Sequence, residues 1–175
     1  MVKVNLLIDD LIKTIAENIV KDVSDLEQII LIGIVTRGYP LAIRLSAQIG
    51  KISGFNPPVG KLDITLYRDD LESKNNVIKL KETLIPTSIE NKIVILVDDV
   101  LFHGRSVRAA IDHVLDYGRP SKIKFAALID RGHRELPICA DYIGTIMETT
   151  PEDIIKVNLV EIDGKDLIEK NDKKD

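Results

Sequence analysis

Apolar residues along the chain recur with two different spacings, and these spacings separate predicted helices from predicted strands. In the first block they recur every three or four residues, which indicates an amphipathic helix from about Asp9 to Val23. The polar face of this helix carries more acids than bases. Residues 29–35 are instead continuously apolar and rich in β-branched side chains, which predicts a strand buried on both faces. Helical spacing then resumes from Leu41 to Ile49.

The alternation of strand and helix continues toward the C-terminus. Residues 92–97 predict another fully buried strand, and the helical spacing that starts at Ser106 stops at Tyr117 and Gly118. Residues 123–129 predict a further buried strand, and weaker strands are expected at 142–146 and 157–162. Strands that alternate with helices predict a doubly wound α/β fold with a mostly parallel sheet.

Two segments interrupt this alternation. Extended arms are predicted at 59–66 and 77–84, and the polar stretch between them suggests a lid at about 67–78. The charged tail at about 169–175 is expected to be frayed. No composition shift divides the chain, so residues 1–175 are expected to form a single domain.

Composition narrows the class of protein. The chain is 45% hydrophobic and 30% charged, as is typical of a soluble globular protein, and it has no apolar run long enough to span a bilayer. Its one cysteine, Cys139, excludes an internal disulfide and favours a cytoplasmic location. The net charge of −4 does not indicate nucleic-acid binding by the molecule as a whole, so any such partner needs a local basic face.

The candidate chemistry lies at the end of the strand that starts at residue 92. Asp98 and Asp99 close the strand, and a short loop with Gly104 leads to Ser106 at the start of a helix. Unpaired N–H groups and the dipole at a helix start favour a bound phosphate, and Gly104 lets the backbone approach it. The two carboxylates are placed to accept hydrogen bonds from vicinal hydroxyls. The pattern therefore predicts a site for a sugar phosphate.

A second polar turn follows the strand at 29–35. Thr36, Arg37 and Gly38 are expected in the same crevice, because ligands of α/β sheets bind at the carboxyl ends of the strands. An arginine beside a hydroxyl and a glycine can hold a pyrophosphate by forked hydrogen bonds. Taken alone, the turn could equally be an ordinary surface turn.

These stretches resemble a known family. The strand, acids and loop at 94–106 resemble the 5-phosphoribosyl-1-pyrophosphate (PRPP) motif of type I phosphoribosyltransferases. Together with 32–38, 63–71, 116–120 and 130–138, in this order, they resemble the PyrR family of pyrimidine operon regulators and uracil phosphoribosyltransferases. The PRPP motif comprises Val94, Ile95, Leu96, Val97, Asp98, Asp99, Val100, Leu101, Phe102, His103, Gly104, Arg105 and Ser106.

The resemblance implies a fold and a reaction. The fold is the type I phosphoribosyltransferase fold, a mostly parallel central sheet flanked by helices, with a flexible β-arm lid and a small hood. The reaction converts uracil and PRPP to UMP and pyrophosphate. Its cofactor is Mg²⁺, held mainly through PRPP, with Asp98 and Asp99 as further candidate ligands. Family members also bind the leader RNA of the pyrimidine operon in response to UMP or UTP, and they form homodimers or larger homo-oligomers.

The resemblance also implies roles for individual residues. Asp98, Asp99 and Arg37 are the expected catalytic residues, with the two acids on the ribose hydroxyls and Arg37, together with Thr36, on the pyrophosphate. The expected PRPP and nucleotide contacts are Thr36, Arg37, Arg68, Asp98, Asp99, Val100, Leu101, Phe102, His103, Gly104, Arg105, Ser106 and Arg131. Arg68 is expected near the lid and Arg131 beside the base and the pyrophosphate. Arg119, His133 and Arg134 are candidate RNA contacts.

Two departures from the family pattern qualify these expectations. His103 stands where the family usually has Thr or Ser, so we expect backbone amides to hold the phosphate while the imidazole points outward or caps the anion. The acid-rich first helix and Cys139 replace part of the basic face through which relatives contact RNA. The enzyme is therefore favoured. An RNA-binding attenuation regulator with little catalysis, or a phosphoribosyltransferase for another base, are the alternatives.

Overall fold

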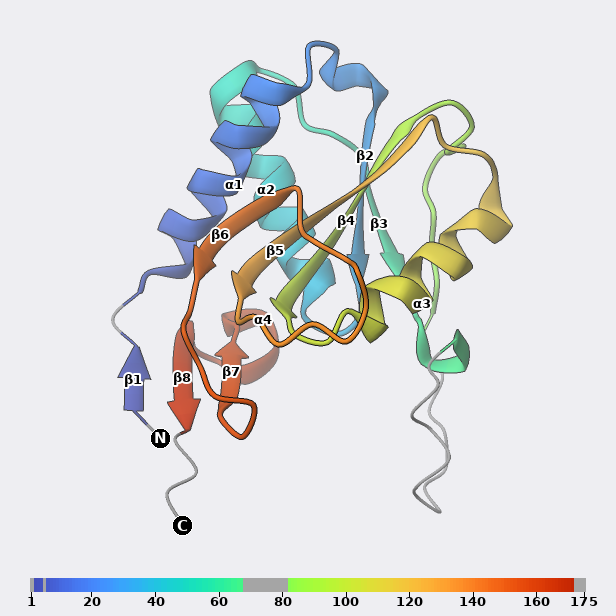
Figure 1. The fold of residues 1–175 in the computed structure, drawn as a ribbon. Coiled ribbons are helices and arrows are strands. Elements are labelled where there is room, and N and C mark those ends of the chain that lie inside the picture. The colour runs from blue at the N-terminus through green and yellow to red at the C-terminus, as the bar shows by residue number, and fades with distance from the viewer. Residues whose placement is uncertain (1, 5, 68–81, 172–175) are drawn as a thin grey trace.

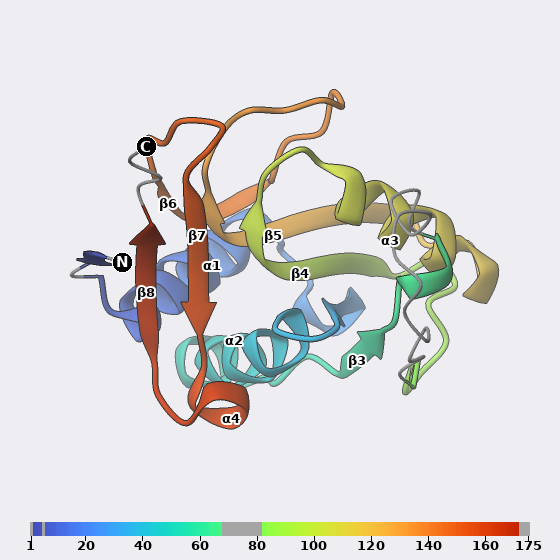
Figure 2. The ribbon, with the colours of Figure 1, turned by 90° about the horizontal axis from the view of Figure 1, so that it is seen from below.

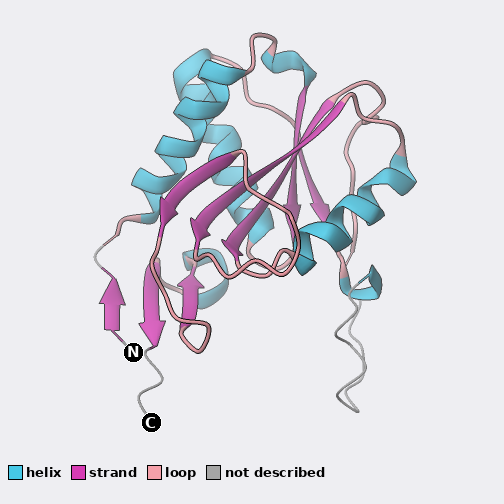
Figure 3. Cartoon of the chain, viewed as in Figure 1, coloured by secondary structure: helices cyan, strands magenta, loops and turns pink. Residues whose placement is uncertain are grey.

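A five-stranded parallel sheet forms the centre of the molecule (Figures 1 and 3). In the computed structural model the described residues are 2–4, 6–67 and 82–171. The strand order β3-β2-β4-β5-β6 places β4, which carries the two acids, in the middle of the sheet. The strands are β2 (Ile29–Ile34), β3 (Val59–Leu62), β4 (Ile93–Leu101), β5 (Lys122–Asp130) and β6 (Tyr142–Ile146).

Helices cover both faces of this sheet (Figure 2). The long helices are α1 (Ile8–Asp22), α2 (Gly38–Ser53) and α3 (Arg105–Val114), and short 3₁₀ turns lie at Leu26–Gln28, Thr65–Tyr67 and Leu115–Tyr117. Alternate residues of each strand point to opposite faces. Leu31 and Ile95 accordingly pack in the core with α1 and α2, whereas Ile32 and Leu96 pack in the core with α3. Burial on both faces explains the continuous apolar runs of the strands.

A small antiparallel sheet lies below the carboxyl ends of the central strands in Figure 1. We call this unit the hood; it comprises β1 (Val2–Val4), β7 (Ile154–Asn158), α4 (Val160–Asp163) and β8 (Leu167–Asn171). Its strand order β1-β8-β7 joins the two ends of the chain, with Val4 opposite Ile168. Leu159 and Ile168 are fully buried in the same core cluster as α1, so the hood packs on the main body.

The principal elements confirm the predicted fold class, but several boundaries were wrong. Residues 160–162 form the start of α4 rather than the end of a strand, because only 154–158 pair with β8. The prediction of a frayed tail is wrong for residues 169–171, which belong to β8 and pair with β7; residues 172–175 lie outside the described residues.

The predicted lid falls largely outside the described residues, which leave out 68–81. The first arm is a strand only to Leu62 and continues into the 3₁₀ turn, so the strand prediction was wrong beyond that residue. On the other side of the gap, Leu84 forms an isolated antiparallel bridge with Lys61. In the described part of the chain, no helix combines the length and apolarity that a membrane span requires.

Candidate functional site

The carboxyl ends of β2 and β4 border a cavity of about 300 Å³. Strands β2 and β4 are parallel neighbours with Gly33 opposite Val97, so the segments that follow Gly33 and Val97 emerge side by side. The cavity is lined by Ile34, Val35, Thr36, Arg37, Ile64, Asp98, Asp99, Val100 and Ser106. The predicted meeting of the Thr36–Arg37 turn with the Asp98–Asp99 pair is therefore present in the structure.

Two glycines allow the turn after β2 to lie close to β4. A Cβ atom on Gly38 would lie 2.2 Å from the carbonyl oxygen of Val97, and one on Gly33 would lie 2.4 Å from the carbonyl oxygen of Gly38. Both contacts are with backbone, which cannot move aside as a flexible side chain can. A glycine in β2 and a glycine at the start of α2 thus allow Arg37 to approach the acids of β4.

The two acids hydrogen-bond to the backbone of their own strand. The Asp99 N–H donates to Asp98 Oδ1 at 2.9 Å, and the Val100 N–H donates to Asp99 Oδ1 at 3.0 Å. Burial raises the pKa of the Asp99 carboxyl, against the opposing effects of a hydrogen bond with Asp98 and the charge of Arg37. A carboxylate that has lost part of its hydration gains from additional donors, such as ribose hydroxyls, or from a cation.

A second cavity, of about 160 Å³, lies in the loop between β4 and α3. It is lined by Asp98 and by residues 100–107, and it shares Asp98, Val100 and Ser106 with the first cavity. Gly104 has φ +90°, a conformation that favours glycine, and it caps the N-terminus of α3. The first-turn N–H groups of a helix have no partner within the helix, so this cavity has the properties of an anion site.

His103 lies at the rim of this loop and faces an acid. Its ring stacks on Phe102 with centroids 3.6 Å apart, and its Nε2 lies 3.6 Å from Glu135 Oε1. Glu135 also pairs with Arg105, with a 2.6 Å contact between Oε2 and Nη2. The imidazole therefore contacts Phe102 and Glu135 directly. His103 also lines the loop cavity, and the expectation that backbone amides hold the phosphate stays a prediction.

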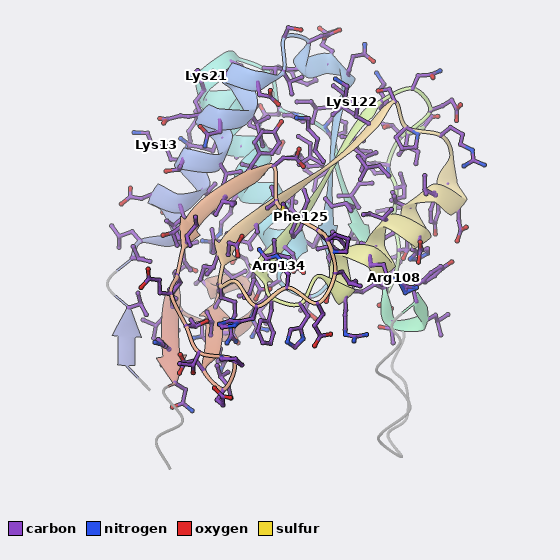
Figure 4. The ribbon with its side chains drawn as sticks, viewed as in Figure 1. Lys13, Lys21, Arg108, Lys122, Phe125 and Arg134 are labelled. Carbon is purple, nitrogen blue, oxygen red and sulfur yellow. The ribbon has the colours of Figure 1, made fainter. Side chains whose placement is uncertain are left out.

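The loop after β5 packs on the loop after β4 through Arg134. The Arg134 Nη1 donates to the carbonyl oxygens of Phe102 at 2.8 Å and Gly132 at 2.9 Å, and its Nε donates to that of Ile138 at 3.0 Å. Its guanidinium also pairs with Asp130. Figure 4 shows Arg134 within the turns of this loop, whereas Lys13 and Lys21 extend from the outer side of α1. The structure thus uses Arg134 to join two loops, and its role as an RNA contact stays a prediction.

Arg131 and His133 also face inward, toward the segment before the hood. Arg131 is 6% exposed, its Nη2 donates to the Thr150 carbonyl oxygen at 2.8 Å, and its Cζ lies 3.9 Å from the Phe102 ring centroid. Burial lowers the pKa of the Arg131 guanidinium. The Nε2 of His133 lies 2.7 Å from the Thr149 carbonyl oxygen. Neither side chain is among the residues that line the two cavities, and the contact of Arg131 with the base stays a prediction.

Of two further residues with expected roles, Arg119 is described in the structure and Arg68 is not. Arg119 is exposed at the turn before β5, where its backbone N–H donates to Glu90. Arg68 lies outside the described residues. The residue before it, Tyr67, stacks on His113 of α3 with ring centroids 4.2 Å apart. The chain that leads into the predicted lid therefore packs against the last turn of α3.

The acids of the site fit a magnesium ion that is held mainly by its substrate. The described residues contain no group of three or more His, Cys, Asp or Glu side chains arranged to bind a metal ion. Asp98 and Asp99 are the two acids that line the first cavity. Mg²⁺ prefers oxygen ligands and is commonly held by one or two carboxylates together with substrate phosphates and water. The residues present therefore fit this ion.

Sequence reasoning missed one contact to the site. Asp163, at the end of α4 in the hood, pairs with Arg37 at 3.0 Å across 126 positions of sequence. In the sequence, the one feature that marks Asp163 is its place directly before Gly164. In the structure this glycine has φ +72° and ends the short helix α4. No periodicity in the sequence connects this position to the turn after β2.

Comparison with known proteins agrees with this geometry. The family model described as a phosphoribosyl transferase domain matches residues 2–163. A curated protein of Alkaliphilus metalliredigens, named bifunctional protein PyrR, is 53% identical over 154 residues, covering 88% of this chain and 85% of its own. A protein of the same name from Deinococcus radiodurans is 47% identical over 161 residues, covering 92% and 88% of the two chains.

Solved structures support the fold. A hypoxanthine-guanine phosphoribosyltransferase of Bacillus anthracis is similar with a TM-score of 0.64 and 21% identity, covering 88% of each chain. A hypoxanthine phosphoribosyltransferase of Staphylococcus aureus gives a TM-score of 0.67 and 18% identity, covering 95% of this chain and 92% of its own. At these identities the similarity concerns the fold alone.

Proposed function

The chain belongs to the phosphoribosyltransferase domain family and, within it, to the PyrR family, and from this premise we propose that it is a Mg²⁺-dependent uracil phosphoribosyltransferase. The proposed reaction breaks the bond between C1′ of PRPP and its pyrophosphate oxygen. A bond forms between C1′ and N1 of uracil, and N1 loses its proton. The products are UMP and pyrophosphate.

One observation carries this proposal. Two adjacent carboxylates, an arginine and the N-terminus of a helix share two cavities that meet at Asp98, Val100 and Ser106. PRPP has the matching groups: two ribose hydroxyls, a pyrophosphate and a 5′-phosphate. The choice of uracil rests on the PyrR relatives and on the resemblance of residues 63–71 and 130–138 to that family.

Asp98 and Asp99 are proposed to bind the ribose hydroxyls. Burial of the Asp99 carboxylate in a closed site strengthens its interaction with positive charge. Departure of pyrophosphate leaves positive charge on the ribose ring, so a carboxylate fixed beside the ring stabilises the transition state more than the ground state. The 5′-phosphate binds the amides of residues 103–106, which hold the sugar in place.

Thr36 and Arg37 are proposed to bind the leaving pyrophosphate. Arg37 offers several fixed N–H donors, and the negative charge on the pyrophosphate grows as the bond to C1′ breaks. Bound Mg²⁺ supplies additional positive charge to the same oxygens. The chain itself orients the two phosphate groups at opposite ends of the ribose, because the β2 turn and the α3 N-terminus lie on either side of Asp98.

An assay with a panel of bases tests the proposal. The purified chain is given PRPP, Mg²⁺ and, separately, uracil, cytosine, hypoxanthine or guanine, and nucleotide formation is followed spectrophotometrically. Turnover with uracil alone is expected. Turnover with hypoxanthine and none with uracil would overturn the base assignment, and no turnover with any base would overturn the proposed activity.

RNA binding is a second proposed function, favoured by relatives that are named bifunctional. The proposed partner is the leader RNA of the organism's pyrimidine genes, with UMP or UTP as the nucleotide signal. Arg119 remains exposed and can contact a phosphate, whereas the structure uses Arg134 within the protein. Because phosphate contacts dominate RNA affinity, the loss of such cations predicts weak binding.

A gel-shift titration over a series of salt concentrations tests this second function. The proposal predicts a nucleotide-dependent shift with the cognate leader, and Arg119→Gln should weaken binding and reduce the salt slope by about one. Equal binding of the leader and a scrambled RNA would contradict it.

We also propose that the chain is cytoplasmic and forms a homo-oligomer of two or more chains. Light scattering in solution would test the oligomeric state.

A further inference from the structure

The hood contacts the candidate pyrophosphate arginine directly. Arg37 Nη2 lies 3.0 Å from Asp163 Oδ1 and 3.2 Å from Asp163 Oδ2, so one guanidinium nitrogen faces both carboxylate oxygens. The side chains are 28% and 19% exposed, respectively. An ion pair that is partly shielded from water is screened less than a surface pair, so this contact can constrain the side chain.

The Asp163 carboxylate is itself held by backbone. The Leu159 N–H donates to Asp163 Oδ2 at 3.0 Å. This hydrogen bond and the nearby charge of Arg37 lower the pKa of the Asp163 carboxyl despite partial burial. Leu159 is fully buried in the main core, so the carboxylate is fixed to a rigid part of the fold.

On its other side, Arg37 acts on the acids of the site. Arg37 and Asp99 line the same cavity, and the positive charge of Arg37 opposes the effect of burial on the pKa of the Asp99 carboxyl. The Nε of Arg37 is buried and has no hydrogen-bond partner among the described residues. Arg37 therefore contacts an acid of the hood and lines the same cavity as the acids of β4.

The hood does not depend on Asp163 for its own attachment. Arg44 of α2 contacts Glu161 at 2.6 Å and Asp166 at 2.7 Å, in addition to the apolar packing of the hood. Arg37 and Arg44 thus both pair with acids of the hood, and of these two arginines Arg37 lines the cavity whereas Arg44 does not. Asp166 provides a matched control for Asp163.

We infer that Asp163 is a positioning residue for pyrophosphate: it holds the Arg37 guanidinium at the mouth of the cavity, in the orientation that the pyrophosphate of PRPP requires. The inference rests on the proposed function, since it assumes that Arg37 binds pyrophosphate. A long arginine side chain loses rotational freedom when it binds an anion, and a carboxylate that holds it beforehand reduces that cost.

Steady-state kinetics of Asp163→Ala, Asp163→Asn and the control Asp166→Ala test this inference. Asp163→Ala is expected to raise the KM for PRPP and the inhibition constant for pyrophosphate by about tenfold, as befits the loss of one charge-assisted contact. The KM for uracil should stay within about twofold, a much smaller change than tenfold. Asp163→Asn can still accept a hydrogen bond and should recover part of the loss. Asp166→Ala should leave both PRPP constants within about twofold.

The double variant Arg37→Ala/Asp163→Ala separates positioning from hood stability. If Asp163 acts through Arg37, the double variant should match Arg37→Ala alone in its KM for PRPP. Additive effects, or equal effects of Asp163→Ala and Asp166→Ala, would overturn the inference while leaving the proposed function intact. Absence of turnover by the unmodified chain would overturn the proposed function and, with it, this inference. If Asp163→Ala fails to fold, the same comparisons apply to Asp163→Asn.

Discussion

The guanidinium of Arg134 donates to the carbonyl oxygen of Phe102 at 2.8 Å, across 32 positions of sequence. This contact joins the loop after β5 to the loop that carries the candidate phosphate site. The N–H groups of Glu135 and Leu136 add hydrogen bonds to the His103 carbonyl oxygen, at 3.1 and 3.3 Å. The shape of the phosphate loop therefore depends on a neighbouring loop that does not itself line either cavity in the described structure.

Replacing Arg134 is expected to lower both stability and affinity for PRPP. Arg134→Gln removes several charge-assisted hydrogen bonds and leaves Asp130 without this partner, at a cost of about 2–3 kcal/mol. For a chain of this size the melting temperature should fall by roughly 5–10 °C. Thermal unfolding and the KM for PRPP measure the two effects.

Arg119→Gln is the control for this prediction, because Arg119 is exposed. Its free energy of unfolding should change by less than about 0.5 kcal/mol. If Arg134→Gln impaired RNA binding but left the melting temperature and the KM for PRPP unchanged, Arg134 would be an RNA contact and not a link between loops.

Asp99→Asn is expected to raise the stability of the fold and to lower the catalytic activity. Burial raises the pKa of Asp99 in the folded chain above its unfolded value, so ionisation of this carboxyl at neutral pH costs stability. Asparagine removes that cost, and the variant should melt a few degrees higher at pH 7 while losing most of its turnover. The advantage should vanish as the pH falls below the unfolded pKa of about 3.9, where both forms are protonated. A variant that melts lower than the unmodified chain at pH 7 would contradict this account.

His103→Thr is expected to change the KM for PRPP by no more than a few-fold. The imidazole stacks on Phe102 and faces Glu135, so the backbone amides of the loop remain the proposed phosphate ligands in either protein. The KM for PRPP at saturating uracil measures the effect. A large gain in affinity would show that His103 impairs the site, and a large loss would show that the imidazole binds the phosphate.

Gly38→Ala is expected to displace the start of α2 from β4. The added methyl group would lie 2.2 Å from the Val97 carbonyl oxygen, and such overpacking typically costs about 1–3 kcal/mol. The movement should also shift Arg37 and raise the KM for PRPP. Lys51→Ala, an exposed change in the same helix, should alter neither quantity. Unchanged values for Gly38→Ala would mean that the β2 turn can move without affecting the site.

The central sheet could be predicted because the hydrophobic pattern of each strand is visible in a short stretch of sequence. Residues 29–35 and 92–97 are apolar on both faces, and this pattern occurs when helices cover both sides of a sheet. The hood lacked such a signal: Val2–Val4 is too short to show periodicity, and it pairs with β8 at the other end of the chain. Val160–Asp163 contains β-branched residues that favour strands, yet tertiary context makes it a helix.

In the candidate site, too, the features that are local in sequence were predicted and those that depend on tertiary packing were not. Asp98, Asp99 and Gly104 are neighbours in sequence, so their motif was visible before the structure. Arg134 is a candidate RNA contact through the resemblance to the family, but in this structure its guanidinium also donates to backbone carbonyl oxygens of two loops, which no local pattern predicts. The contact of Asp163 with Arg37 depends on how the hood packs, which no local pattern records.

A crystal structure of the chain with UMP tests the central claim most directly. The claim is that Asp98 and Asp99 and the loop at 101–106 together bind a phosphorylated ribose. The account predicts the 5′-phosphate within hydrogen-bond distance of the loop amides and the two ribose hydroxyls on the carboxylates. UMP bound in another cavity, with no ligand density beside Asp98 and Asp99 at saturating nucleotide, would contradict it.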